Sequence, residues 1–284
     1  MRKLTCSWSN EISIDSLLFH VVGVGKVSSS FAKSLARRCP GLRFGYVVSR
    51  DIDKSRSLAL ELGAEPKSYN DEFSLEGVIL FGYSDSVLAE APKIVGGKIG
   101  FDVVAVHFSG FHPSTIFPES WNPVSIHPNC AVASYDFDFA QKIFGVEGSK
   151  NGLKIAKLLL EKLGARYFEI RTDAKKVYHL AAVLTSNFPV AFLYLAKKLY
   201  SKLGIDEPLI RGILHSLLSS VTSNVLEREL HEALTGPVKR GDWEVVGEEG
   251  RIFREHFPEY ASIYHTVVLI LNNLLDEARG KSER

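Results

Sequence analysis

The segment of the sequence best suited to chemistry is a glycine-rich turn at residues 23–28, GVGKVS. It follows the GxGxxG pattern of dinucleotide-binding turns, with Ser28 at the position of the third glycine. In such a turn the first glycine permits a tight bend, the second lets the backbone approach a pyrophosphate, and the third position needs a small residue. We expect phosphate contacts, partly through free amides at the start of the following helix, from Gly23, Gly25, Lys26, Val27 and Ser28. A tight turn that binds no ligand is the alternative.

Ser49 and Arg50 follow the next apolar run and bear on which dinucleotide binds. A site selective for NAD usually carries Asp or Glu here, whereas a hydroxyl followed by a guanidinium suits a ribose 2′-phosphate. The pair therefore predicts NADP as the cofactor. Asp51 comes directly afterwards and would restore an acidic residue if the register shifted, and Arg50 could instead be a solvated surface charge.

Several other polar residues follow apolar runs that are typical of strands. Ligands of an open parallel sheet bind beyond the carboxyl ends of its strands. We therefore expect four residues to border the cofactor: Tyr83, Ser84, Asp85 and Ser109. His127 follows in the same part of the chain and is expected to contact a small-molecule substrate.

Alternating strand-like and helix-like runs position these residues. The expected strands are 17–22, 43–49, 78–83 and 102–106, and the expected helices between them are 28–38, 53–62 and 84–91. A last pair of strands, 143–146 and 167–170, flanks a helix at 153–163. Such repeated units predict an α/β fold, a parallel sheet with helices on both faces.

The apolar periodicity becomes helical almost throughout from residue 172, with expected helices at 174–203, 207–230 and 259–278. We therefore place a dinucleotide-binding domain at 1–171, with an extension at 1–16, and an all-helical domain at 172–284. On the first long helix Lys176, His179, Val183 and Asn187 recur every three or four residues and so share one face.

The composition is that of an ordinary soluble protein. The 284 residues include 34 Lys+Arg and 33 Asp+Glu, a net charge of +1 that argues against nucleic acid as a partner. Three widely spaced cysteines, Cys6, Cys39 and Cys130, favour the reducing cytoplasm. Residues 177–196 lack any charge, but polar residues interrupt the stretch, which favours a buried helix over a membrane span.

Motifs in order along nearly the whole chain resemble one protein family. They are GVGKVSS at the turn, SR at 49–50, YSD at 83–85, HFSG at 107–110, HP at 127–128, VEG at 146–148, KKVYHLAAVLTSN at 175–187 and ALTGPVKRGD at 233–242. The resemblance is to Rossmann-like proteins with a DUF2520 domain, relatives of 6-phosphogluconate dehydrogenase and pyrroline-carboxylate reductase. Ser28 and the segment after residue 242 depart from the family pattern, and His256 is an uncertain counterpart of a family histidine.

The resemblance implies NADP binding, reductase activity and a helical domain that forms a homodimer. By analogy with related dehydrogenases, His179 is expected to donate a proton, Asn187 to orient substrate, and Lys176 to assist. His179 and Asn187 could instead be satisfied polar groups of a helical core. Arg240 and Asp242 could reach the substrate or simply pair with each other.

These features predict an NADP-dependent oxidoreductase that transfers a hydride to or from a small carbonyl, imine or hydroxy compound. The alternative is an NADP-binding sensor or scaffold without turnover. No metal is expected, because His107, His112 and His127 lack a ligand spacing. The uncharged stretch at 177–196 also needs cover, which supports a homodimer through the helical domain.

Overall fold

The computed structural model describes residues 13–282 and divides into two compact units between Phe188 and Pro189. Cys6 and most of the expected extension lie outside the described residues. The helical region begins close to residue 172, as the sequence predicts, but the division falls about four turns further on, inside helix α6 (Lys175–Lys202).

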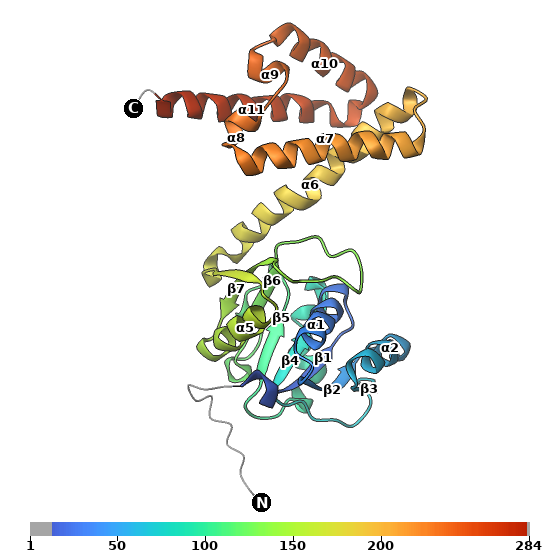
Figure 1. Cartoon of the computed structure of the whole chain (residues 1–284), viewed down its shortest axis with the longest axis vertical. Helices are drawn as coiled ribbons and strands as arrows, with labels where there is room; N and C mark the ends of the chain where they lie inside the picture. Colours follow the sequence, from blue (N-terminus) through green and yellow to red (C-terminus); the bar gives the residue numbers. More distant parts are fainter. Residues whose placement is uncertain (1–12, 283–284) are drawn as a thin grey trace, which may run out of the picture. The chain divides into compact units, whose positions relative to one another are not determined.

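The first unit contains an eight-stranded sheet in the order β3-β2-β1-β4-β5-β6-β7-β8 (Figure 1). The strands are β1 (Leu18–Val22), β2 (Arg43–Val48), β3 (Glu65–Lys67), β4 (Val78–Phe81), β5 (Val104–His107), β6 (Val124–Pro128), β7 (Ile143–Gly148) and β8 (Arg166–Glu169). All neighbouring strands are parallel except β6 and β7. The order reverses between β1 and β4, which is where open parallel sheets bind their ligands.

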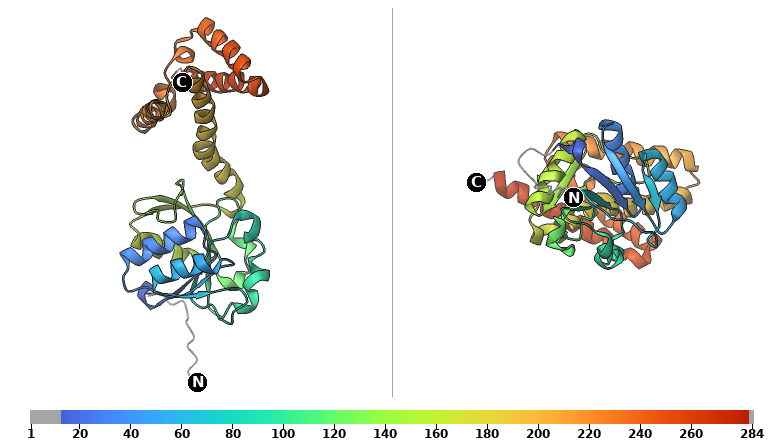
Figure 2. Two further views of the ribbon diagram at one scale, coloured as in Figure 1. Left: turned by 90° about the vertical axis from the view of Figure 1, so that its right-hand side faces the viewer. Right: turned by 90° about the horizontal axis from the view of Figure 1, so that it is seen from below.

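Helices cover both faces of this sheet (Figure 2). One face packs on α1 (Lys26–Arg38), α2 (Ile52–Leu62) and α5 (Lys150–Lys162). The opposite face packs on α3 (Asp85–Leu88) and α4 (Ala91–Val95), and on the loop residues Phe117 and Trp121. Because successive strand residues point to opposite faces, Val21 and Val22 enter different cores. This confirms the predicted α/β architecture.

The structure differs from the predicted elements at β3 and β6. The region from Val106 to Tyr135 has the weak periodicity that is typical of loops, yet β6 lies within it, between two 3-10 turns and a further loop. Val124 and Ser125 pair with both β5 and β7, and Ile126 to Pro128 pair with β7. The strand conformation of β6 therefore depends on neighbours distant in sequence, which a local pattern does not reveal.

The second unit is entirely helical within the described residues. It contains the end of α6, α7 (Glu207–Glu227), α8 (Leu230–Ala233), α9 (Pro237–Arg240), α10 (Trp243–His256) and α11 (Ala261–Ser282). Its buried core is small and is formed by Val238, Val246 and Leu275. In the described chain one helical stretch, Thr172–Lys202, is long and apolar enough to cross a membrane by composition alone, which is weak evidence for a span.

Candidate active site

The glycine-rich turn joins β1 to α1 and packs tightly against the end of β4. Gly23 has a φ of +87°, a conformation that favours glycine, and its amide donates to the carbonyl of Val48 (2.8 Å). The Ser28 hydroxyl lies 3.1 Å from the Gly23 carbonyl oxygen and accepts from the Gly25 amide (3.2 Å). Serine at the third position is thus built into the turn as a small, buried hydrogen-bonding residue.

Gly82, directly after β4, allows this close approach. Its amide donates to the Val22 carbonyl (2.8 Å). A Cβ at this position would lie 2.0 Å from Ser28 Oγ and 2.1 Å from the Gly23 carbonyl oxygen. A Cβ at Gly25 would likewise lie 2.7 Å from the Gly82 oxygen. The turn therefore consists of backbone with no room for side chains at Gly82 and Gly25. The first amides of α1 have no carbonyl partner within the helix, so they are suited to binding a pyrophosphate.

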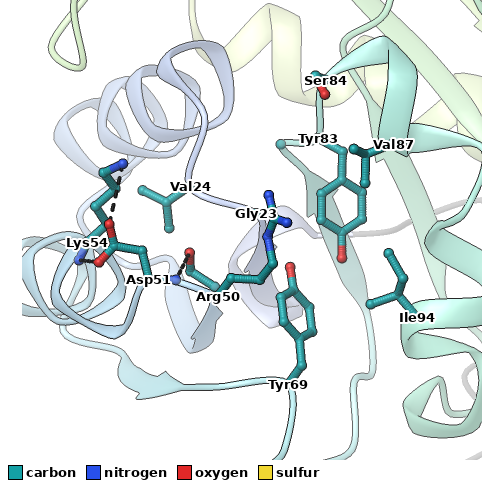
Figure 3. Close-up of a pocket in the computed structure, with 12 residues that line it drawn as sticks. Gly23, Val24, Arg50, Asp51, Lys54, Tyr69, Tyr83, Ser84, Val87 and Ile94 are labelled. Atoms are coloured by element: carbon teal, nitrogen blue, oxygen red, sulfur yellow. Dashed lines mark hydrogen bonds and ion pairs between the residues drawn. The ribbon is translucent and has the colours of Figure 1, made fainter.

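A pocket of about 680 Å³ opens beside the turn (Figure 3). Five residues expected to bind cofactor line it: Gly23, Ser49, Arg50, Tyr83 and Ser84. The other expected contacts lie outside its lining: Gly25, Lys26, Val27 and Ser28 at the start of α1, Asp85 at the start of α3, and Ser109 after β5. Ser28 is fully buried, so its part in the site is to shape the turn.

The acidic residue beside Arg50 is occupied within its own helix. Asp51 is the N-cap of α2, and its carboxylate accepts from the Lys54 amide (3.2 Å) and pairs with Lys54 Nζ (3.4 Å). These contacts with Lys54 hold the pKa of Asp51 below its usual value. Arg50 and Lys54 both line the pocket with cationic side chains. The Asp51 carboxylate is already bonded to the amide and the ammonium group of Lys54.

Lys54 and Tyr69 are pocket residues that the sequence analysis missed. Tyr69 follows β3 and extends into the same pocket as Tyr83 and Arg50 (Figure 3). Burial raises the pKa of both tyrosines, so their rings and neutral hydroxyls form a wall of the pocket. The short strand β3 brings Tyr69 here, and no local pattern predicts that strand.

A second polar cluster lies where β5 and β6 end and α6 begins. Lys175 is 1% exposed, and its Nζ donates to the Ser109 carbonyl (2.8 Å) and the Ser125 hydroxyl (2.6 Å). Lys176, the lysine singled out from the sequence, is exposed, with its Nζ 5.5 Å from the centre of the Phe111 ring. Lys175 is therefore the lysine that enters the cluster, because the packing of α6 turns that position inward.

Two expected residues, His127 and His179, meet in this cluster. Their ring centres are 5.9 Å apart. His127 Nδ1 lies 2.6 Å from the Tyr178 hydroxyl, and His179 Nδ1 is buried without a hydrogen-bond partner among the described residues. Asn187, two turns further along α6, is exposed and accepts a hydrogen bond from its neighbour Ser186 (2.9 Å).

Glu147 on β7 connects two segments next to this cluster, and the sequence analysis missed it as well. It is 2% exposed, and its carboxylate accepts from the Ser114 amide (2.7 Å), the Ser114 hydroxyl (2.8 Å) and the Thr172 hydroxyl (2.9 Å). It therefore ties the loop after β5 to the segment that leads into α6. Its signal in the sequence was a lone acidic residue within an apolar strand.

Arg240 and Asp242 lie in the second unit and pair with each other. Arg240 Nε donates to an Asp242 carboxylate oxygen (2.8 Å), and both side chains are largely exposed. This is the arrangement that the sequence left open as their alternative. Among residues 13–282, no group of His, Cys, Asp and Glu has the arrangement of a metal site.

Comparisons with known proteins identify the family and the fold. Residues 142–270 match the family model described as a domain of unknown function, DUF2520. Protein TM1727 from Thermotoga maritima is 35% identical, with a TM-score of 0.74, over 92% of this chain and 99% of that one. The chain belongs to the Rossmann-like, DUF2520 domain-containing family. No curated protein sequence matches it.

Two further solved structures place this DUF2520 protein among dinucleotide-binding folds. BF3122 from Bacteroides fragilis, a protein assigned as an NADP oxidoreductase, is 25% identical with a TM-score of 0.76, over 92% of this chain and 100% of that one. Pyrroline-5-carboxylate reductase from Coxiella burnetii is 14% identical with a TM-score of 0.55, over 90% and 98% of the two chains. The second likeness concerns the fold alone.

Burial and one fixed cation set the electrostatics of the DUF2520 protein's polar cluster. Burial lowers the pKa of Lys175 to about 8, so the side chain is still mainly cationic at pH 7. Burial, and then the charge of Lys175, lower the pKa of His127 to about 4. The same two causes hold the pKa of His107 well below its usual value. At neutral pH the cluster therefore combines the buried ammonium of Lys175 with uncharged imidazoles at His107 and His127.

Proposed function

We propose that this DUF2520 protein is an NADP-dependent oxidoreductase that acts on a small hydroxy, carbonyl or imine compound. One observation carries the proposal. Arg50 and Lys54 line the pocket beside the glycine-rich turn, while Asp51 caps α2 and pairs with Lys54. Two cations with the neighbouring carboxylate already bonded suit the extra phosphate of NADP better than the 2′-hydroxyl of NAD.

The residues of the pocket fit the parts of the dinucleotide. Gly23, Gly25 and the first amides of α1 would hold the pyrophosphate, since a Cβ at Gly25 or Gly82 would fill the space that lets these backbones come together. Arg50 and Lys54 would bind the 2′-phosphate, and the rings of Tyr69 and Tyr83 offer flat apolar surface beside the adenine end. NADP, when bound, supplies the hydride chemistry.

The polar cluster would serve the substrate. His127 and His179 carry nitrogen atoms suited to exchanging a proton with a reacting oxygen or nitrogen. Lys175 is buried and bonded to Ser109 and Ser125, so it acts through its neighbours. Asn187, Arg240 and Asp242 remain candidates for substrate contact.

Titration of the full-length protein with NADPH and NADH tests the cofactor. We expect saturable binding that is tighter for NADPH. Arg50→Ala should weaken NADPH binding by about 10- to 100-fold, the loss expected for a hydrogen-bonded charge pair, and leave NADH unaffected. Arg56→Ala is the matched control, because Arg56 lies on α2, the helix that follows Arg50, pairs with Asp53 and does not line the pocket. Absence of binding by either nucleotide would refute the proposal.

A screen of small metabolites, followed by the absorbance of NADPH, separates an enzyme from a sensor that binds the cofactor without turnover. For an enzyme, His179→Ala should abolish the activity found and leave NADPH affinity unchanged. Activity that persists undiminished in this variant would remove His179 from the catalytic residues.

A further inference from the structure

A chain of hydrogen bonds that starts at a backbone carbonyl fixes the tautomer of His127. The amide nitrogen of Asn129 donates to the Ile143 carbonyl (3.3 Å), so the oxygen Oδ1 of Asn129 faces Tyr178. The Tyr178 hydroxyl has one proton, which it donates to that oxygen (3.0 Å). The 2.6 Å contact between Tyr178 and His127 then requires His127 Nδ1 to be the donor. His127 Nε2 is therefore left without a proton.

This unprotonated nitrogen faces the backbone of Gly110. A Cβ at Gly110 would lie 2.8 Å from His127 Nε2 and 2.6 Å from His179 Nδ1. A side chain at Gly110 would therefore collide with both rings, and the glycine lets the loop backbone pack against them, while the His127 residue as a whole remains half-buried. His179 Nδ1 is buried and has no partner in the described part of the chain, and Phe111 packs its ring edge-on to His179 at 6.0 Å. Two imidazole nitrogens therefore lie against the Gly110 backbone, and the one on the half-buried His127, unlike that on His179, is not a buried atom without a partner.

Lys175 holds together the two segments that carry Gly110 and His127. Its ammonium bonds the carbonyl of Ser109, which precedes Gly110, and the hydroxyl of Ser125, which lies two residues before His127 on β6. The Ser125 hydroxyl in turn donates to the same Ser109 carbonyl (2.9 Å). A single buried cation thus fixes the segment after β5 against the first residues of β6.

The charged and titratable groups around His127 come from three elements, α6, β5 and α3. Lys175 and His179 on α6, and His107 on β5, oppose a proton on the His127 ring. Asp85, the first residue of α3, favours one. Tyr178 on α6 accepts from Nδ1 in either protonation state. Burial and Lys175 outweigh Asp85, which leaves the ring uncharged at neutral pH.

We propose that Lys175 is a positioning residue that keeps the half-buried His127 in place beside Gly110 with its Nε2 unprotonated, so that this nitrogen accepts a hydrogen bond from a substrate hydroxyl or amine. The substrate class is therefore one that presents a donor. A carbonyl oxygen has no proton to give to Nε2. The substrate part of this inference rests on the proposed oxidoreductase function, whereas the state of His127 does not.

NMR of the ¹⁵N-histidine-labelled full-length protein tests the inference without cofactor or turnover. Long-range ¹H–¹⁵N correlations should show His127 as the Nδ1–H tautomer at pH 7. Its titration midpoint should lie well below that of the exposed histidines. Lys175→Met should raise this midpoint by about one pH unit or more, because a nearby cation is removed. Lys176, the exposed neighbour of Lys175, provides a matched control. Lys176→Met should leave the titration midpoint of His127 unchanged.

Two other variants separate charge from packing. Lys175→Gln keeps a hydrogen-bond donor without the charge and should also raise the midpoint. Tyr178→Phe removes the oxygen that holds the Nδ1 proton and should increase the Nε2–H tautomer. An Nε2–H tautomer in the wild-type protein, or a midpoint that neither Lys175 variant moves, would overturn the inference.

The choice of substrate class is tested with 2-propanol and acetone as probes. The alcohol should shift the ¹⁵N resonance of His127 Nε2 in a saturable way, and acetone should not. Equal shifts with both probes would refute the donor requirement. Failure to bind NADPH would refute the proposed function but leave the tautomer and its dependence on Lys175 standing.

Discussion

At the scale of residues, the contrast between neighbouring side chains decides what each can do. Asp51 follows Arg50 directly and appears in the sequence as a possible ribose ligand. In the structure its carboxylate caps α2 through the Lys54 amide. Lys175 and Lys176 are also adjacent in the sequence, yet Lys175 is buried against Ser109 and Lys176 is exposed. The helical phase of α6, set by packing, cannot be read from two consecutive lysines.

Because Asp51 caps α2, its replacement should lower the stability of the protein without changing which dinucleotide it prefers. Asp51→Ala should lower the free energy of unfolding by about 1 kcal/mol, the usual cost of losing an N-cap. It should not weaken the preference for NADPH, because Arg50 and Lys54 remain. Urea unfolding and nucleotide titration measure the two effects. Asp53→Ala, on the same first turn, is the control for stability. Loss of NADH affinity in Asp51→Ala would instead indicate an acidic ribose ligand.

The buried Lys175 predicts a characteristic dependence of stability on pH. Its pKa is lowered from 10.5 to about 8 by burial. Between these values the unfolded chain keeps a proton that the folded chain has lost, so stability rises with pH. The gain amounts to about 3 kcal/mol between pH 8 and 10.5. Urea unfolding should show this rise in the wild-type protein relative to Lys175→Met. Parallel curves for the two proteins would contradict it.

At the scale of elements, local patterns predicted some parts of the site and failed for others. The β1–turn–α1 unit could be predicted because its apolar run, glycines and helix periodicity are all local. The strand β6 could not, because its conformation depends on pairing with β5 and β7. Tyr69, Lys54 and Glu147 were missed for a related reason. Each reaches its site from an element whose position is set by distant neighbours.

Gly82 lies where the glycine-rich turn packs on the end of β4, and we expect this position to tolerate no side chain. Gly82→Ala would place a Cβ 2.0 Å from Ser28 Oγ and 2.1 Å from a backbone oxygen of Gly23. Since the backbone must move, we expect a loss of stability of about 1–3 kcal/mol. NADPH binding should be lost as well, because the turn would open. Thermal unfolding and nucleotide titration measure both effects. Gly97→Ala, which has no atom within 4 Å of the added Cβ, should behave like the wild-type protein.

At the scale of the whole molecule, the helices present more apolar surface than one chain covers. In the apolar window of the stretch Thr172–Lys202 only 6% of residues are buried. Leu180 and Leu184 on α6 are 54% and 51% exposed, and Leu217 and Val221 on α7 are 57% and 56% exposed. Soluble monomers rarely leave large apolar areas exposed. We therefore propose that a second copy of the chain covers it, as expected from the sequence.

Light scattering of the purified protein should give the mass of a dimer, twice 31.5 kDa. Leu184→Lys should shift the equilibrium towards monomer, because a charge in a dry interface lacks a partner. Leu60→Lys is the matched control, since Leu60 is 86% exposed and belongs to α2 instead of α6 or α7, and its replacement should leave the dimer intact. A monomeric wild-type protein would refute the proposal. A monomer that also sediments with lipid vesicles would instead assign the apolar stretch of α6 to a membrane surface.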